Sequence, residues 1–202
     1  MIELADYKEL RYWTTLKKTS LNKPDKNSEI YMTNLELPAI DFDAVKKKYA
    51  SKFKLKNGPK SNDALVQVGG TVFFIEFKDG NMKNERFDVV QKIYDSLLIY
   101  CDITKQTISD TRSYMVYIIV YNGAASRDYL KECVDENRKS DTINEAPSFV
   151  EFGTALGGLA KTNADVFGWR GRFGGIYFKD VLTIEKNAFS EEVFKIGKEN
   201  SL

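Results

Sequence analysis

The clearest pattern in the chain is a pair of apolar runs separated by two glycines. Residues 64–68 and 71–77 are rich in β-branched and aromatic residues, and Gly69-Gly70 lies between them. A Gly-Gly pair is a favoured two-residue hairpin loop because glycine adopts positive φ without steric cost. The second run is apolar on both faces, which is typical of a buried central strand. The pattern therefore predicts a β-hairpin with its loop at the two glycines.

Apolar positions elsewhere predict helices and further strands. Helical spacing is found in residues 5–18, 86–101 and 126–138, and Asp41 or Asp43 is placed to cap a helix that runs to about Phe53. Strands are predicted over 29–37, 113–121 and 176–184, and a closing helix or tail over 190–196. We expect 113–121 to lie beside 71–77. These parts together predict an α/β fold, a mixed central β-sheet flanked by helices.

The predicted hairpin brings charged side chains to one patch. Counting outward from the Gly-Gly loop places Asp63 opposite Glu76, with Cβ atoms roughly 4.5–5.5 Å apart. Side chains alternate along a strand, so Lys78 lies on the same face as Glu76. Two carboxylates that face each other repel, and a divalent cation with oxygen ligands would relieve the repulsion. Such a cation beside a lysine is suited to phosphodiester hydrolysis.

Asp63, followed after twelve residues by Glu76-Phe77-Lys78, resembles the PD-(D/E)XK nuclease superfamily over about residues 61–122. The resemblance implies a restriction-endonuclease-like core. It also implies that Asp63, Glu76 and the carbonyl of Phe77 bind Mg²⁺ or Mn²⁺ and that Lys78 is the catalytic lysine. The implied activity is nucleic-acid hydrolysis, with DNA favoured over RNA. One departure from the family pattern is Asn62, which stands where the family often has proline.

The same resemblance suggests secondary site residues. Related nucleases often place a glutamine or lysine on the helix after the E-x-K strand, which makes Gln91 and Lys92 candidates, and we assign Gln91 to the catalytic set. Some members add an acidic residue from a preceding helix. Glu9 is the best candidate for that role, although an exposed helix charge is the simpler interpretation.

Composition excludes several kinds of site. The chain has 202 residues, two cysteines and no histidine, so catalysis by Ser-His-Asp or Cys-His groups and metal ligation by histidine are excluded. Cys101 and Cys133 are expected to be buried free thiols. No apolar run is long enough to span a membrane, and the first ten residues lack a signal-peptide pattern. We expect a cytoplasmic protein that does not enter a membrane.

The length suggests a single nuclease-like domain. We divide it into a mainly helical part over 1–60, the motif-bearing core over 61–122, and helix and strand additions over 123–202. Residues 149–160 contain three glycines but lack the lysine and the spacing of a phosphate-binding loop.

Positive charge is concentrated in two places, although the net charge is only +1. Residues 46–60 carry seven lysines and no acidic residue, and the stretch runs directly into Asp63. It suits a phosphate backbone, with Lys52, Lys54, Lys56 and Lys60 as candidate contacts. Arg170 and Arg172, which stand among aromatic residues, form a second candidate nucleic-acid contact, where Trp169 could stack on a base. The simpler interpretation there is a glycine-rich turn with its aromatics in the core.

Two other functions are open from the sequence. The chain could have a nuclease fold without activity and bind nucleic acid or a protein partner, in a toxin–immunity or phage-defence setting. It could also be an unrelated α/β protein whose hairpin charges are solvated. A homodimer or another protein partner is compatible with both.

Overall fold

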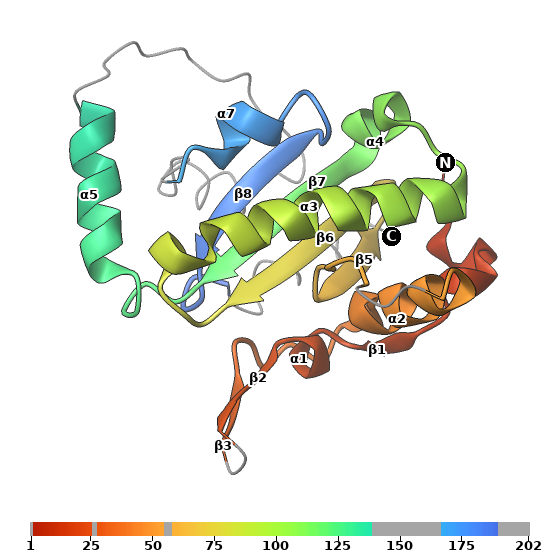
Figure 1. Cartoon of the computed structure of the whole chain (residues 1–202), viewed down its shortest axis with the longest axis horizontal. Coiled ribbons are helices and arrows are strands. Elements are labelled where there is room, and N and C mark those ends of the chain that lie inside the picture. The colour runs from red at the N-terminus through yellow and green to blue at the C-terminus, as the bar shows by residue number, and fades with distance from the viewer. Residues whose placement is uncertain (1, 26–27, 55–57, 139–166, 190–202) are drawn as a thin grey trace.

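The computed structural model describes residues 2–25, 28–54, 58–138 and 167–189, and these form an α/β fold around a six-stranded mixed sheet (Figure 1). The sheet order is β1-β4-β5-β6-β7-β8, and β2 pairs with β3 in a separate two-stranded sheet. The strands are β1 (Trp13–Thr15), β2 (Leu21–Asp25), β3 (Ser28–Tyr31), β4 (Pro38–Asp41), β5 (Ala64–Val68), β6 (Thr71–Lys78), β7 (Met115–Tyr121) and β8 (Asp180–Glu185).

The predicted hairpin is confirmed. Strands β5 and β6 are antiparallel, with Val68 paired to Thr71 and Ala64 paired to Ile75. Gly69 has a φ of 55°, in the left-handed region that favours glycine. On its other side β6 pairs with β7 in parallel, and β7 pairs with β8 in parallel. Residues 113–121 were therefore correctly placed beside the E-x-K strand.

Helices cover the sheet. The longest, α3 (Met82–Thr104), lies across one face in Figure 1, and the β2–β3 hairpin projects away from the body. Asn81 caps α3 and Asp41 caps α2, each by accepting a backbone N–H bond with its side chain. The other helices are α1 (Leu16–Thr19), α2 (Phe42–Lys52), α4 (Ile108–Tyr114), α5 (Arg127–Arg138) and α7 (Trp169–Phe173), with two 3₁₀ turns, η1 (Leu4–Asp6) and η2 (Lys8–Leu10).

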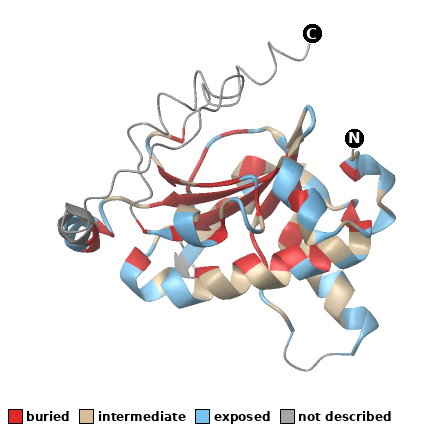
Figure 2. Ribbon diagram, turned by 90° about the horizontal axis from the view of Figure 1, so that it is seen from above, coloured by how far each residue is buried: buried red, intermediate tan, exposed pale blue. Residues whose placement is uncertain are grey.

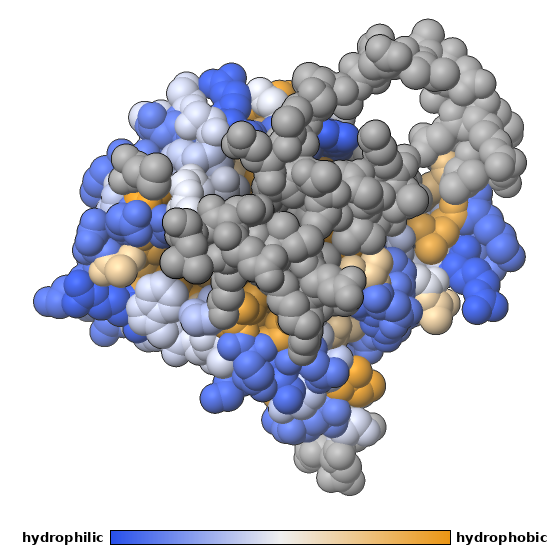
Figure 3. Space-filling model, turned by 180° about the vertical axis from the view of Figure 1, so that it is seen from behind, coloured by the Kyte–Doolittle hydropathy of each residue, from blue (hydrophilic) through white to orange (hydrophobic). Residues whose placement is uncertain are grey.

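Two hydrophobic clusters hold the sheet in place, one on each face. Phe74 and Tyr117 belong to the cluster that packs under α3, whereas Phe73 and Ile75 belong to the opposite one. Buried residues are concentrated in the sheet and on the inner side of α3 (Figure 2). Seen from behind, the described surface carries apolar side chains among hydrophilic ones (Figure 3). Glu76 shares the α3 face of β6 with Phe74, because the two are two residues apart.

The N-terminal helix predicted over 5–18 is wrong. This segment forms η1, η2, β1 and the single turn α1. From the start of η1 to α1 the buried leucines are Leu4, Leu10 and Leu16, spaced six residues apart, and that spacing does not follow one face of a helix. Residues 13–15 pair instead with β4 as the edge of the sheet.

The bounds of other elements also differ from the predicted ones. The strand predicted over 29–37 ends at Tyr31, and the first two residues of the predicted 113–121 strand belong to α4, which begins with a capping box at Thr107 and Asp110. The last strand covers 180–185, not 176–184. Residues 149–160 and 190–196 lie outside the described residues. No described helix is long and apolar enough to cross a membrane.

Candidate metal and phosphodiester site

The hairpin places Asp63 and Glu76 side by side at the end of the sheet. Oδ2 of Asp63 accepts a hydrogen bond from the backbone N–H of Phe77 at 2.7 Å, which fixes this carboxylate beside β6. Glu76 is fully buried on the α3 face of the same strand. Its Oε2 atom has no hydrogen-bond partner in the described part of the chain. A buried carboxylate oxygen without a partner is costly, which makes Glu76 an unusual residue in this core.

Two lysines converge on these carboxylates. Nζ of Lys92, from α3, lies 2.7 Å from Oε1 of Glu76 and 3.5 Å from Oδ1 of Asp63. Nζ of Lys78 lies 3.3 Å from the same oxygen of Glu76. Both ammonium groups therefore contact Oε1 and leave Oε2 of Glu76 unpaired.

A second layer of acidic groups surrounds the lysines. Lys78 also donates to Glu85 at 3.0 Å and to Asp88 at 2.6 Å, both on α3. Asp88 in turn accepts a bond from the side chain of Lys60, just before Asp63. The site is consequently a connected network of alternating charges, in which each lysine contacts at least one carboxylate.

Burial governs the protonation of the two central acids. It raises the pKa of Glu76 from 4.5 to about 8, and the nearby Asp63 carboxylate adds to the effect, while Lys92 and Lys78 oppose it. Burial also raises the pKa of Asp63, again against the opposing charge of Lys92. The fold therefore disfavours the charge of these two acids, so an added cation beside them would be favoured.

The outer groups are shifted in the opposite sense. Burial alone would raise the pKa of Asp88, but hydrogen bonds from Lys60 and Lys78 outweigh it and lower the pKa to about 2. Burial disfavours charge on Lys78 and Lys92, yet the surrounding carboxylates together outweigh it, Glu76 foremost, and the pKa of each lysine is raised. The lysines therefore stay charged at neutral pH.

The loop before Asp63 is anchored by two hydrogen bonds of Asn62. Asn62 is fully buried, its N–H donates to Oγ of Ser96 at 2.8 Å, and its Oδ1 accepts from the hydroxyl of Tyr117 at 2.6 Å. Proline has no N–H and no side-chain acceptor, so it could make neither bond. Asn62 thus ties the loop before Asp63 to α3 and β7.

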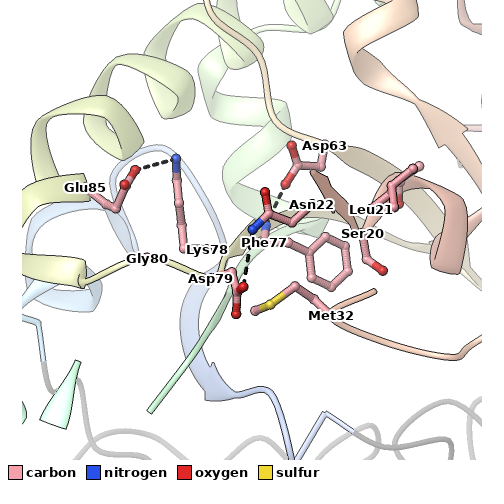
Figure 4. A pocket seen from close by; sticks show the side chains of 11 residues that line it. Ser20, Leu21, Asn22, Met32, Asp63, Phe77, Lys78, Asp79, Gly80 and Glu85 are labelled. Atoms are coloured by element: carbon pink, nitrogen blue, oxygen red, sulfur yellow. Dashed lines mark hydrogen bonds and ion pairs between the residues drawn. The ribbon is translucent and has the colours of Figure 1, made fainter. Parts of the chain in front are cut away.

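A pocket of about 400 Å³ opens at Asp63 and Lys78 (Figure 4), whereas Glu76 is not among its lining residues. Asp63, Phe77, Lys78 and Glu85 line it together with residues 19–22, at the end of α1 and the start of β2. Asp79 accepts a hydrogen bond from Asn22 at 3.2 Å and thereby ties the β2–β3 hairpin to the end of β6. The pocket gives solvent and small groups access to Asp63 and Lys78.

The structure brings together some of the predicted site residues. Asp63, Glu76, Phe77 and Lys78 meet as expected, and Lys92 joins them from α3. Gln91, by contrast, forms no hydrogen bond with either central carboxylate in the described structure, because it lies one residue away from the inward-facing side of the helix. Glu9 is exposed and pairs with Lys52 at 3.4 Å.

The predicted nucleic-acid contacts divide in a similar way. Lys52 and Lys54 are exposed, Lys60 is bound to Asp88, and Lys56 lies outside the described residues. Arg170 forms a two-bond pair with Asp180, at 2.8 and 2.9 Å. Trp169 is buried, with 1% exposure, as are Phe167 and Phe173, so the simpler interpretation that the aromatics of this segment belong to the core is confirmed and Trp169 is not placed to stack on a base. Arg172 is exposed on α7.

Sequence reasoning missed three acidic residues near the site. Glu85 and Asp88 share the inward side of α3 with Lys92, at spacings of three and four residues, and this spacing was a readable signal. Asp43 lies in the first turn of α2 and accepts a bond from the hydroxyl of Ser61, two residues before Asp63. Its proximity to the site depends on the tertiary fold, so the sequence carried no direct signal for it.

The donor set is compatible with a hard divalent cation. Mg²⁺ is often held by one or two carboxylates, with waters completing its shell. No group of three or more acidic or cysteine side chains surrounds a common point in the described residues. The unpaired Oε2 of Glu76 and the neighbouring Asp63 carboxylate are the oxygens that fit such an ion.

Comparison of the chain with protein-family models, with curated proteins and with solved structures gave no match.

Proposed function

We propose that this protein is a metal-dependent phosphodiesterase that hydrolyses nucleic acid, with DNA favoured over RNA, and that its core is restriction-endonuclease-like. The observation that carries the proposal is the convergence of Asp63, Glu76 and Lys78 at the end of a hairpin, with Oε2 of Glu76 buried and unpaired. The order of elements, a hairpin, then α3, then the parallel strand β7, supports the same interpretation.

Asp63, Glu76 and the carbonyl of Phe77 would hold Mg²⁺ or Mn²⁺, which would supply a Lewis acid to the scissile phosphate. Side chains of the protein would supply the remaining electrostatic stabilisation and positioning. Lys78 lines the pocket and carries a charge that is held in place by Glu85 and Asp88, so it is oriented to stabilise negative charge on a phosphoryl oxygen. Hydrogen bonding of Asp63 to the Phe77 amide keeps its carboxylate in a fixed orientation.

A second function is favoured by one observation. The network already balances its central carboxylates with Lys78 and Lys92, so the repulsion that suggested a cation is relieved by the protein itself. A nuclease-fold protein that binds nucleic acid or a protein partner without cutting would have the same network. Catalysis and binding therefore need to be separated by experiment.

The test is incubation of purified protein with supercoiled plasmid, linear duplex, single-stranded DNA and RNA, each with Mg²⁺, Mn²⁺ or EDTA. If the protein is a nuclease, cleavage should require the metal and should be lost in Asp63→Ala and Lys78→Ala. Circular dichroism should show that both variants are folded. Binding of the same substrates without cleavage under all metal conditions would favour the second function.

A further inference from the structure

Lys60, in the loop between α2 and β5, is held against α3 by both its backbone and its side chain. Its N–H donates to Oδ2 of Asp95 at 2.8 Å, and its ammonium group contacts Oδ1 of Asp88. Two residues later the N–H of Asn62 donates to Oγ of Ser96 on the same helix at 2.8 Å. These bonds fix the position of the Lys60 ammonium group relative to α3.

Asp88 joins Lys60 to Lys78. The oxygen of Asp88 that Lys60 does not contact, Oδ2, lies 2.6 Å from Nζ of Lys78, closer than the carboxylates of Glu76 and Glu85. Each oxygen of Asp88 therefore contacts one ammonium group, which gives this carboxylate a defined orientation between the two lysines. The side chain of Lys78 is 10% exposed and that of Lys60 is 45% exposed. The contacts thus lead from the surface of the protein to the proposed catalytic lysine.

The position of Lys60 and Asp88 suits an effect on Lys78 better than direct contact with the substrate. Neither residue is among the described residues that line the pocket of Figure 4, whereas Lys78 is. Lys78 pairs with three carboxylates at 2.6–3.3 Å. These negative groups would cancel its charge toward a phosphate unless they had other partners, and Lys60 is such a partner for Asp88.

We infer that Asp88 is a positioning residue for Lys78, and that Lys60 acts on Lys78 through Asp88 instead of binding a substrate phosphate. The inference rests on the proposed function, in which Lys78 stabilises negative charge on a phosphoryl oxygen. Asp88 holds the ammonium group beside the pocket. Lys60 balances the charge of Asp88, so the charge of Lys78 remains available to the substrate. Loss of Lys60 should therefore slow the chemical step without weakening substrate binding.

The test measures kcat and KM for cleavage of labelled DNA at saturating Mg²⁺, and DNA affinity in EDTA at several salt concentrations by fluorescence anisotropy. The variants are Lys60→Gln, which removes a charge at a half-exposed position, Asp88→Asn, which keeps the shape of the side chain, and the double variant. Lys60→Arg keeps the charge and tests rescue. Lys83→Gln is the matched control, because it also breaks a lysine–carboxylate pair, with Glu132 at 2.8 Å. Circular dichroism checks that each variant is folded.

We expect Lys60→Gln to lower kcat about tenfold, while KM, the affinity in EDTA and its salt dependence match those of Lys83→Gln. Lys60→Arg should restore kcat. Asp88→Asn should lower kcat at least as much as Lys60→Gln does, and the double variant should be no slower than Asp88→Asn, because the two residues act in series.

Three results would overturn the inference. One is an unchanged kcat in Lys60→Gln, and another is a pair of losses in kcat that multiply in the double variant. The third is weaker binding by Lys60→Gln with a slope of log affinity against log salt that is shallower by about 1, which would make Lys60 a phosphate contact.

Amine labelling separates failure of this inference from failure of the proposed function. If the unaltered chain cuts no substrate, the proposed function fails, but acylation by acetic anhydride in EDTA still reports how Lys78 is held. Mass spectrometry should then show faster acylation of Lys78 in Asp88→Asn than in the unaltered chain, because the ammonium group has lost its nearest partner. Equal acylation of Lys78 in the two proteins would overturn its positioning by Asp88.

Discussion

The ammonium group of Lys92 lies 2.7 Å from Oε1 of Glu76, and this pair joins α3 to the E-x-K strand at the centre of the site. The same ammonium lies 3.5 Å from Asp63, so it contacts both of the proposed metal ligands. A cation bound by these carboxylates would compete with Lys92 for their negative charge. The relationship therefore predicts that metal affinity is set partly by a lysine that is not itself a ligand.

Replacement of Lys92 by methionine, which keeps the length of the side chain, tests this competition. We expect Lys92→Met to lower the unfolding free energy in EDTA by up to about 3 kcal/mol, because buried carboxylates lose their partner. Mn²⁺ should bind about tenfold more tightly, since the competing charge is gone. Isothermal titration with Mn²⁺ alone measures the affinity. Lys60→Met is the control, because Lys60 contacts Asp88 and neither metal ligand, and equal Mn²⁺ affinities in all three proteins would rule out competition.

The raised pKa of Glu76 predicts a pH dependence of stability. Its folded pKa of about 8 exceeds the ordinary 4.5, so the folded state binds the extra proton between these values and stability falls as pH rises through that range. The slope from this group is at most about 1.4 kcal/mol per pH unit. Asp63 acts in the same sense, since its pKa is also raised.

Urea unfolding in EDTA at several pH values from 5 to 8 measures this slope. In Glu76→Gln the dependence of unfolding free energy on pH should be flatter. This variant should therefore become more stable relative to the unaltered chain as pH rises. Asp128→Asn is the control, because its carboxylate is 89% exposed. A slope unchanged by Glu76→Gln would show that Glu76 does not titrate in this range.

The sequence predicted those parts of the fold that are determined by neighbouring residues, and it failed where contacts between distant residues decide the structure. The β5–β6 hairpin and the cap of α2 follow from neighbouring residues, and both were predicted correctly. The N-terminal segment was not, because its buried leucines contact distant parts of the chain; the N–H of Leu4, for instance, donates to the side chain of Gln67. Tertiary contacts there outweighed helical propensity.

The candidate site shows the same division. Asp63, Glu76 and Lys78 come from one hairpin, so strand alternation and register were sufficient to bring them together. Lys92 and Asp88 reach the site across the packing of α3 on the sheet, and Asp43 through the start of α2. Which side of a long helix faces a sheet residue depends on a rotation of about 100° per residue, so Gln91 and Lys92 could not be separated from the sequence.

The two hydrogen bonds of Asn62 predict that proline at this position would destabilise the fold. Asn62→Pro removes the N–H bond to Ser96 and the acceptor of the Tyr117 hydroxyl, and each buried group left unpaired costs about 1–3 kcal/mol. Asn62→Ala keeps the N–H and should lose only the second contribution. Thermal unfolding of the two variants gives the difference. Equal stability of Asn62→Pro and the unaltered chain would show that neither bond contributes.

The lysine stretch before Asp63 predicts a salt dependence of binding. Replacing Lys47, Lys48 and Lys54 with glutamine should weaken nucleic-acid binding and make the slope of log affinity against log salt shallower by about 2, because three phosphate contacts are lost. The control removes equal charge at Lys23, Lys83 and Lys131, which pair with carboxylates elsewhere. Slopes that match between the two triple variants would place the nucleic-acid path away from α2.

The central claim is that Asp63 and Glu76 hold a metal that cuts phosphodiester bonds, and the most direct measurement is the cleavage rate of labelled DNA as Mg²⁺ is titrated. The account predicts no cleavage in EDTA, a rate that rises and saturates with Mg²⁺, and a loss of at least about a hundredfold in Glu76→Ala, measured on protein that circular dichroism shows to be folded. Cleavage by purified Glu76→Ala at the rate of the unaltered chain would contradict it.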